Sequence, residues 1–353
     1  MTKEASMRFY TQQHQHYCGI DLHARSLYVC ILDQAGKPLL HRKLACDRDE
    51  LLQVLKPYKR DLAVAVECLF CWYWVADLCE EQGITFVLGH ALFMKAIHGG
   101  KTKNDRIDSY KIAALLRGGN LPQAYVYPRK MRPTRDLLRR RLFFARKRGE
   151  LFAHVQNTNT QYNLPPLEQR VGKTKDRGEV IEHFEEERVQ MSVAVDVTLV
   201  AAYDEVIREL ELFLVHEVRQ DHNTGFFLLR SIPGIGEILA LTLLYEIHDI
   251  KRFPRVQDFL SYSRLVKGTH ESAGKTKKMT GGKMGNVHLK WAFSEAAALF
   301  LRGNAAGQKY FARLEKKHGK GKALSVLAAK LGRAVYYILL RGKPFDPKRF
   351  LTA

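Results

Sequence analysis

Residues 17–33, YCGIDLHARSLYVCILD, set the pattern for the first third of the chain. Two apolar runs rich in Ile, Val, Leu and Tyr are separated by a short polar stretch, which is typical of two strands joined by a turn. The turn-forming residues 33–36 then lead to a third apolar run at 39–44. The segment therefore predicts the first three strands of a sheet.

Helices and further strands alternate after this segment. Asp47 and Glu50 form a capping box that predicts the start of a helix. The sequence then predicts a buried strand, a helix that stops at a glycine, and another strand, at 62–67, 72–81 and 84–88. Strands that alternate with helices predict a mixed α/β sheet covered on both faces.

The composition points to a polyanionic partner. The 353 residues contain 57 Lys and Arg against 37 Asp and Glu, a net charge of +20, and such an excess favours nucleic acid over a membrane. No run of about 18 apolar residues predicts a membrane span, and the polar tail at 1–16 lacks a signal-peptide core. We therefore expect a cytoplasmic, nucleoid-associated protein. Its six cysteines are expected to be reduced structural thiols, and a metal site at the CxxC of Cys68 and Cys71 is the alternative.

Four carboxylates are candidate metal ligands. Asp105 and Asp108, in the basic stretch KTKNDRID at 101–108, lie three apart at the start of a predicted helix and so share a face. Asp21 sits inside the first strand and Glu67 ends the fourth, and adjacent strands would bring them together. The four could bind two hard cations that act on a phosphodiester. The alternative for the helical pair is a role in capping and dipole stabilisation.

Two long helical regions follow. The first, after Pro133, carries ten Lys and Arg in residues 129–148 opposed within that stretch by Asp136, which favours contact with nucleic acid over a solvated face. The second spans about 178–218, and we expect the two to form a helical hairpin at 133–220. A 4-3-4-3 spacing predicts a coiled-coil seam, which either pairs within the chain or forms a dimer, at Leu199, Tyr203, Val206, Leu210 and Phe213.

The last third is predicted to be helical. Residues 233–236, PGIG, precede an apolar helix and form either a helix-hairpin-helix that offers backbone N–H groups to a DNA phosphate or a plain helix–helix turn. A loop rich in Gly and Lys at 267–286 can approach a DNA backbone closely. Helices are expected at 288–302, 308–317 and 321–341.

These landmarks together resemble the DEDD insertion-sequence transposase/recombinase family, which includes the Piv-type DNA invertases and the bridge-RNA-guided recombinases. The resemblance covers about residues 17–341 and is carried by GIDLH at 19–23, VAVE at 64–67, KNDRID at 103–108, IPGIG at 232–236, ESAG at 271–274 and GGKMGN at 281–286 with Leu289.

The resemblance implies three parts: a RuvC-like, RNase H-type domain at 17–128, a basic helical coiled-coil segment at 129–222, and a helical transposase domain with a serine loop at 223–353. It implies that Asp21, Glu67, Asp105 and Asp108 bind Mg²⁺, or alternatively Mn²⁺, and that Ser272 attacks a DNA phosphate to give a phosphoserine. The family commonly has Ser-Gly where this chain has Ser-Ala-Gly, and it usually has a proline near Lys267. The register of the serine loop therefore leaves three alternatives, Ser261, Ser263 and Ser294.

We predict a DNA recombinase that moves its own mobile element, works as a homodimer or homotetramer on double-stranded donor and target DNA, and uses a guide RNA. The alternatives are a RuvC-like metal-dependent nuclease without a covalent intermediate, and a non-catalytic DNA- or RNA-binding protein derived from a transposase. The predicted nucleic-acid contacts are Lys101, Lys103, Arg106, Arg135, Arg139, Arg140, Arg141, Arg146, Lys147, Gly234, Gly236, Lys275, Lys277, Lys278, Lys283 and Asn286.

Overall fold

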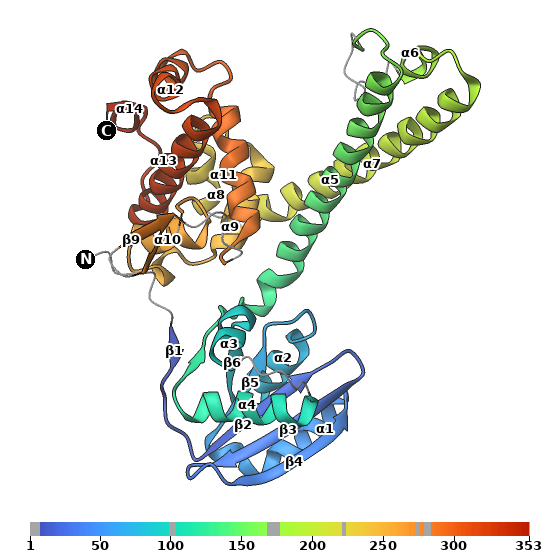
Figure 1. Cartoon of the computed structure of the whole chain (residues 1–353). Coiled ribbons are helices and arrows are strands. Elements are labelled where there is room, and N and C mark those ends of the chain that lie inside the picture. Colours follow the sequence, from blue (N-terminus) through green and yellow to red (C-terminus); the bar gives the residue numbers. More distant parts are fainter. Residues whose placement is uncertain are drawn as a thin grey trace. The chain divides into compact units, whose positions relative to one another are not determined.

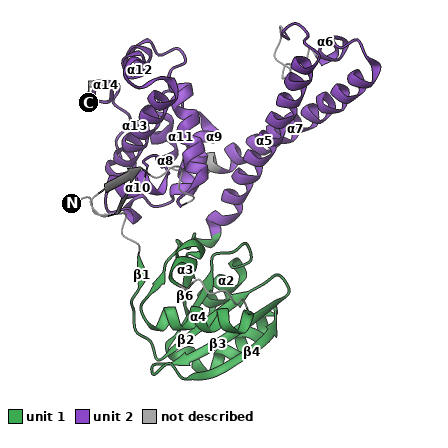
Figure 2. Ribbon diagram, viewed as in Figure 1, with its two compact units in different colours: residues 1–129 green, residues 130–353 purple. Residues whose placement is uncertain are grey.

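The structure is a computed structural model that describes residues 8–98, 104–167, 177–220, 224–267, 269–272, 275–278 and 284–352. The chain divides into two compact units, residues 1–129 and 130–353 (Figures 1 and 2). Among the predicted nucleic-acid contacts, Lys101, Lys103 and Lys283 lie outside the described residues.

The first unit is built on a five-stranded mixed sheet in the order β4-β3-β2-β5-β6. Three strands form an antiparallel meander, β2 (His16–Leu22), β3 (Ser26–Asp33) and β4 (Pro38–Ala45), and two run parallel to β2, β5 (Leu62–Glu67) and β6 (Thr85–Gly89). Two short strands, β1 (Phe9–Tyr10) and β7 (Leu121–Pro122), pair separately. The predicted mixed sheet is confirmed.

Helices cover both faces of this sheet. On one face α1 (Arg48–Leu55) and α2 (Tyr73–Gln82) pack against the even-numbered residues of β2. On the other face α4 (Asp105–Arg117) packs against the alanines of β5, with α3 (Ala91–His98) nearby in the chain. The predicted caps are present, since the Asp47 side chain accepts the Glu50 N–H and Gly83 ends α2 with φ 65°.

Glycine at position 19 lets α4 lie directly on the sheet. A Cβ at Gly19 would lie 2.3 Å from the carbonyl oxygen of Ser109 and from the backbone nitrogen of Ala113, both in α4. No side chain fits in that space. The glycine therefore sets how closely the helix that carries Asp105 and Asp108 approaches β2.

The second unit begins with an antiparallel helical pair, α5 (Arg132–Gln161) and α7 (Glu187–Gln220), with the short α6 (Arg177–Glu182) between them in sequence (Figure 1). Three ion pairs between the two long helices show that the helices run antiparallel, because the residue numbers of the partners fall along α7 as they rise along α5. These pairs are Arg141–Glu211, Arg148–Asp204 and His154–Asp196.

Of the two roles predicted for the seam of α7, pairing within the chain is wrong, and the dimer role stays a prediction. Leu199, Val206 and Phe213 are 44%, 38% and 56% exposed. The buried positions also recur every seven residues, but on another face of the helix: Val193, Val200, Ile207 and Leu214. Both stripes have the spacing of a seam, and contact with α5 selects the second.

The rest of the second unit is a helical core. Its helices are α8 (Thr224–Arg230), α9 (Glu237–Ile247), α10 (Val256–Tyr262), α11 (Val287–Phe300), α12 (Ala305–His318), α13 (Lys320–Arg341) and α14 (Pro347–Thr352). By length and hydropathy α13 resembles a membrane span, which the sequence was not expected to contain. Leu327, Leu331 and Val335 of α13 are fully buried in the core of the unit, however.

The predicted serine loop contains regular structure in its described residues. Strands β8 (Thr269–Ser272) and β9 (Lys275–Lys278) pair antiparallel, with Ser272 opposite Lys275. The glycines and lysines of 267–286 favoured a loop, and the strand sequences THES and KTKK contain no alternating apolar pattern that would have indicated strands. The expectation of a wholly helical end is corrected accordingly.

Candidate active site

Asp21 and Glu67 lie on neighbouring strands at the same edge of the sheet. Strands β2 and β5 run parallel with Ile20 beside Val66, so Asp21 and Glu67 are the next residue of each strand. Alternation along the strands places both on the side of Gly19 and Ala65, the face that α4 covers. The sequence prediction that adjacent strands bring these two residues together agrees with this register.

The first turn of α4 carries the other two carboxylates. Asn104 caps the helix, because its side chain accepts the Arg106 N–H at 2.9 Å. Asp105 and Asp108 follow on one face, with side chains 48% and 36% exposed. Asp108 is paired with Lys111 at 3.3 Å.

His23 joins this cluster although it was not among the predicted site residues. Its Nε2 lies 3.3 Å from Oδ2 of Asp21 and 3.5 Å from Oδ1 of Asp105. One ligand atom from each of Asp21, His23 and Asp105 lies within 4.8 Å of the others, close enough for the three to share one metal ion. The i, i+2 spacing from Asp21 places both side chains on one face, but this spacing is too common at the end of a strand to have identified His23.

Burial raises the pKa of Asp21 above its ordinary value. His23 lowers that pKa, whereas the neighbouring Asp105 and Asp108 raise it. A nearby cation would therefore stabilise the ionised form of Asp21, because it would offset both the desolvation of the carboxylate and its repulsion by the other carboxylates. Carboxylates gathered in this way fit a hard divalent cation.

In the second unit, the segment that carries Ser272 is closed at its base. The Asn286 N–H donates to the Tyr262 carbonyl at 2.6 Å, and Nε of Arg264 donates to the Gly285 carbonyl at 2.9 Å. A Cβ at Gly285, which has φ 96°, would lie 2.5 Å from the Tyr262 oxygen. Residues 262 and 286 are thus held together on either side of the β8–β9 hairpin.

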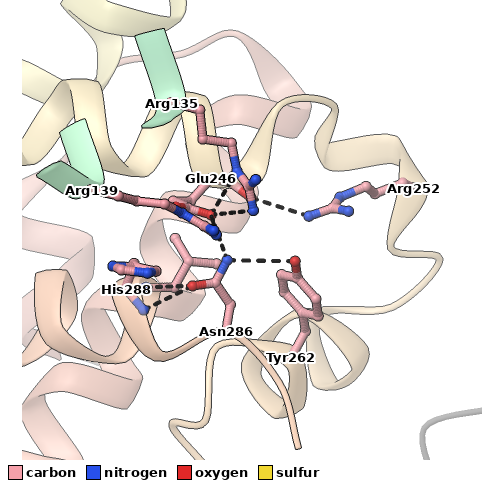
Figure 3. Close-up of polar contacts among 8 residues, drawn as sticks. Arg135, Arg139, Glu246, Arg252, Tyr262, Asn286 and His288 are labelled. Carbon is pink, nitrogen blue, oxygen red and sulfur yellow. Dashed lines mark hydrogen bonds and ion pairs between the residues drawn. The ribbon is translucent and has the colours of Figure 1, made fainter. Parts of the chain in front are cut away.

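A buried carboxylate anchors this base to the helical core (Figure 3). Glu246 of α9 is 2% exposed and accepts hydrogen bonds from Arg135 and Arg139 of α5. Asn286 donates from Nδ2 to Glu246 at 2.7 Å and caps α11 with Oδ1. Burial raises the pKa of Glu246, but the arginines and Asn286 lower it more, so the pKa lies below its ordinary value. Burial also lowers the pKa of the adjacent His288 to about 4, helped by the arginines.

The predicted nucleic-acid contacts of α5 fall into two groups. Arg135 and Arg139 bind Glu246, and Arg141 binds Glu211 of α7. Their partners are distant in sequence, and this is why the helix looked unopposed. Arg140 and Arg146 are exposed, and the Arg140 guanidinium lies over the Phe143 and Phe144 rings. Lys147 is paired with Glu150 on the surface.

Further predicted contacts have defined surroundings. Arg106 is exposed in the first turn of α4. Gly234, with φ 83°, packs against α11, since a Cβ would lie 2.5 Å from the backbone nitrogen of Phe300, and this favours the plain helix–helix turn. Gly236 is exposed at the start of α9. Lys275, Lys277 and Lys278 belong to β9.

The alternative serines have surroundings of their own. Ser263 is fully buried, which separates its hydroxyl from any DNA strand. The Ser294 hydroxyl donates to the Lys290 carbonyl within α11. Ser261 is partly buried in α10.

Family models match most of these landmarks. The DEDD transposase model of the IS110 group matches residues 18–163, and a second model, described as Transposase IS116/IS110/IS902 family, matches residues 227–312. The two matches belong to one group, occur in order and cover both units. The chain belongs to the IS110 family of transposases.

Individual relatives agree with this family. The chain is 24% identical over 345 residues to the transposase for insertion sequence element IS1111A of Coxiella burnetii, which covers 93% of this chain and 90% of the relative. It is 32% identical over 125 residues to the pilin gene-inverting protein of Moraxella bovis, covering 34% and 38%, respectively. The transposase for element IS1328 of Yersinia enterocolitica is 26% identical over 147 residues, covering 40% and 43%.

In this IS110-family chain the first match contains all four predicted carboxylates, and the second contains Ser272. Two residues of these regions escaped the sequence prediction, His23 and Glu246. The sequence contained no signal for Glu246, because its partners Arg135 and Arg139 lie 111 and 107 positions away.

Proposed function

We propose that the protein cuts and rejoins DNA through a phosphoserine intermediate, with Ser272 as nucleophile and Asp21, Glu67, Asp105 and Asp108 as the metal-binding carboxylates. The observation that carries the proposal is the convergence of Asp21 and Asp105, from a strand and a helix 84 positions apart in the chain, within 4.8 Å of one another and of His23. Membership in a transposase family supports the reaction class.

The donor set fits a divalent metal, and we propose Mg²⁺, with Mn²⁺ as the alternative. Carboxylate oxygens are the preferred ligands of both ions. When bound, such an ion supplies Lewis-acid stabilisation of charge on a phosphodiester. The carboxylates of Asp21 and Asp105 would hold it, with Glu67 and Asp108 beside them. The raised pKa of Asp21 supports a site that is completed by positive charge.

The chemistry of the serine is balanced without loss of the phosphodiester. Ser272 Oγ forms a bond to the DNA phosphorus, and the bond between that phosphorus and the 3′ oxygen breaks. The proton of the serine hydroxyl passes to a general base, and the departing 3′ oxygen takes up a proton. A 3′ hydroxyl of another strand later attacks the same phosphorus and releases the serine. The backbone hydrogen bonds of Tyr262, Arg264 and Asn286 join the two chain segments that lead to the hairpin, which supports a role for them in holding the strand that carries Ser272.

We propose further that the first unit is RuvC-like and that α5 and α7 form the coiled-coil connector, which the seven-residue spacing of Val193, Val200 and Ile207 supports. We propose double-stranded DNA and a guide RNA as partners and the nucleoid as location. The net charge of +20 supports a nucleic-acid partner and fits DNA alone as well as DNA with RNA. A second copy of the chain would cover the exposed stripe at Leu199 and Phe213, an assembly that sedimentation velocity tests.

A covalent adduct assay tests the proposed chemistry. The complete mobile element with its flanking DNA is expressed with wild-type protein, Ser272→Ala or Asp108→Ala, and the protein is denatured and examined for bonded DNA. We expect an adduct with the wild type and none with Ser272→Ala. With Asp108→Ala we expect at most about one hundredth of the wild-type level, because removal of a metal ligand raises the activation free energy of a metal-assisted step by several kcal/mol.

Ser294→Ala is the matched control, since its hydroxyl is hydrogen-bonded within α11, and it should keep the adduct. Cut DNA without an adduct that still depends on Asp108 would establish the nuclease instead. DNA that is neither cut nor bonded by the wild-type protein would favour the binding protein.

A further inference from the structure

We propose that the His23 imidazole is a nitrogen ligand of the metal site at the end of β2, and that it raises the affinity of this site for Mn²⁺ more than its affinity for Mg²⁺. The inference rests on the proposed function, because it concerns the same carboxylates. It adds a fifth ligand residue and a shift in metal preference to them.

The position of the ring nitrogen carries the proposal. His23 Nε2 lies 3.3 Å from Asp21 Oδ2 and 3.5 Å from Asp105 Oδ1. The imidazole interacts with Asp21 and lowers the pKa of that carboxyl, and the same nitrogen also faces Asp105. One nitrogen thus lies between two carboxylates, and all three ligand atoms lie within 4.8 Å of one another. This is the spacing of donor atoms around one cation.

The backbone holds the imidazole in place. The His23 N–H donates to the Ser26 carbonyl at 2.9 Å, across the turn from β2 to β3. The His23 carbonyl accepts a hydrogen bond from the Cys46 thiol at 3.3 Å. Because both backbone groups of the residue are bound, its side chain leaves the turn in a fixed direction. The side chain is 49% exposed, so an aqueous ion can reach it.

Nitrogen coordination distinguishes the two ions. Mg²⁺ prefers oxygen ligands in a near-ideal octahedron and loses water reluctantly. Mn²⁺ also binds carboxylates and is the weakest binder of the first-row transition series, but as a softer ion than Mg²⁺ it accepts a nitrogen ligand in place of one of the oxygens more readily. Asp21 and Asp105 serve either ion, and His23 adds affinity for Mn²⁺ in particular.

Metal binding to the full-length protein tests this directly. Mn²⁺ alone is titrated and its free concentration is followed by electron paramagnetic resonance, Mg²⁺ is measured by competition, and pulsed spectra of bound Mn²⁺ report coupling to imidazole nitrogen. The proteins are the wild type, His23→Ala, Asp105→Asn and, as matched control, His41→Ala. His41 contacts the same end of α4, at the Arg106 carbonyl and the Ser109 hydroxyl, but belongs to β4.

We expect His23→Ala to raise the dissociation constant of Mn²⁺ by about tenfold or more, that of Mg²⁺ by about threefold at most, and to abolish the nitrogen coupling. His41→Ala should keep the coupling. If wild-type Mn²⁺ shows no nitrogen coupling, or if His23→Ala changes both constants equally, the proposal fails. Loss of Mn²⁺ binding in Asp105→Asn would then still support the proposed function, whereas a wild-type protein that binds neither ion would contradict that function as well.

Discussion

Gly19 is a residue at which the backbones of β2 and α4 approach closely, and it connects the packing of the first unit with the candidate site. The backbone of α4 at Ser109 and Ala113 occupies the volume that a side chain at position 19 would need. Asp21 is two residues further along the strand, and Asp105 begins the helix. A shift of α4 away from the sheet therefore separates the two carboxylates.

We expect Gly19→Ala to lower the free energy of unfolding of the first unit by about 1–3 kcal/mol or more, because overpacking against backbone cannot relax by a rotamer change. It should also lower adduct formation. Gly149→Ala is the control: a Cβ at this exposed residue of α5 would have nothing within 4 Å, and alanine there should be neutral or stabilising. Urea unfolding followed by circular dichroism measures both, and an unchanged midpoint for Gly19→Ala would contradict the packing argument.

At the same scale, residue type and spacing identified Asp21 and Asp105 as site candidates but not His23. Burying a carboxylate inside an apolar strand costs free energy unless an ion pair or hydrogen bond compensates, and this made Asp21 a site candidate. His23 stands after the last residue of β2, where a polar residue is ordinary. Its proximity to Asp105 depends on how α4 crosses the sheet, and no local pattern contains that information.

Among the elements, those decided by local patterns were predictable. The strands of the first unit, the cap at Asp47 and the end of α2 at Gly83 follow from signals a few residues long. The seam of α7 did not, because the helix carries two stripes with the same repeat, and only the position of α5 decides between Val200 and Leu199. The β8–β9 hairpin was missed because its residues carry no alternating apolar pattern.

Glu246 links three helices, and its loss should destabilise the second unit. In Glu246→Gln the two arginines of α5 keep their charge, but Arg135, which is 8% exposed, loses its ion pair with Glu246. We expect the free energy of unfolding to fall by about 3–5 kcal/mol, as for other buried pairs broken on one side.

Glu237→Gln, in the same helix, breaks a more exposed pair with Arg230 and should change the free energy of unfolding by about 1 kcal/mol at most. Chemical denaturation at neutral pH compares the two variants. Equal effects would show that the buried network contributes no more than a surface ion pair.

On the scale of the whole molecule, the positive charge is unevenly divided. Residues 130–353 contain 40 Lys and Arg against 24 Asp and Glu, whereas residues 1–129 contain 17 against 13. The net charge therefore belongs mainly to the second unit, although several of its arginines are bound to carboxylates. Nucleic-acid affinity should depend on the cations that remain exposed, such as Arg140 and Arg146.

Salt dependence measures how many of these cations meet phosphates. Each contact with duplex DNA contributes about 0.9 to the slope of log affinity against log salt concentration. We expect the double variant Arg140→Gln, Arg146→Gln to reduce that slope by about 2 in titrations of a short duplex, with a parallel loss of affinity. Arg48→Gln removes one charge from the first unit, where the guanidinium already pairs with Glu81 at 2.6 Å, and should leave the slope unchanged. An equal fall in slope for both proteins would mean that net charge, rather than this face of α5, governs binding.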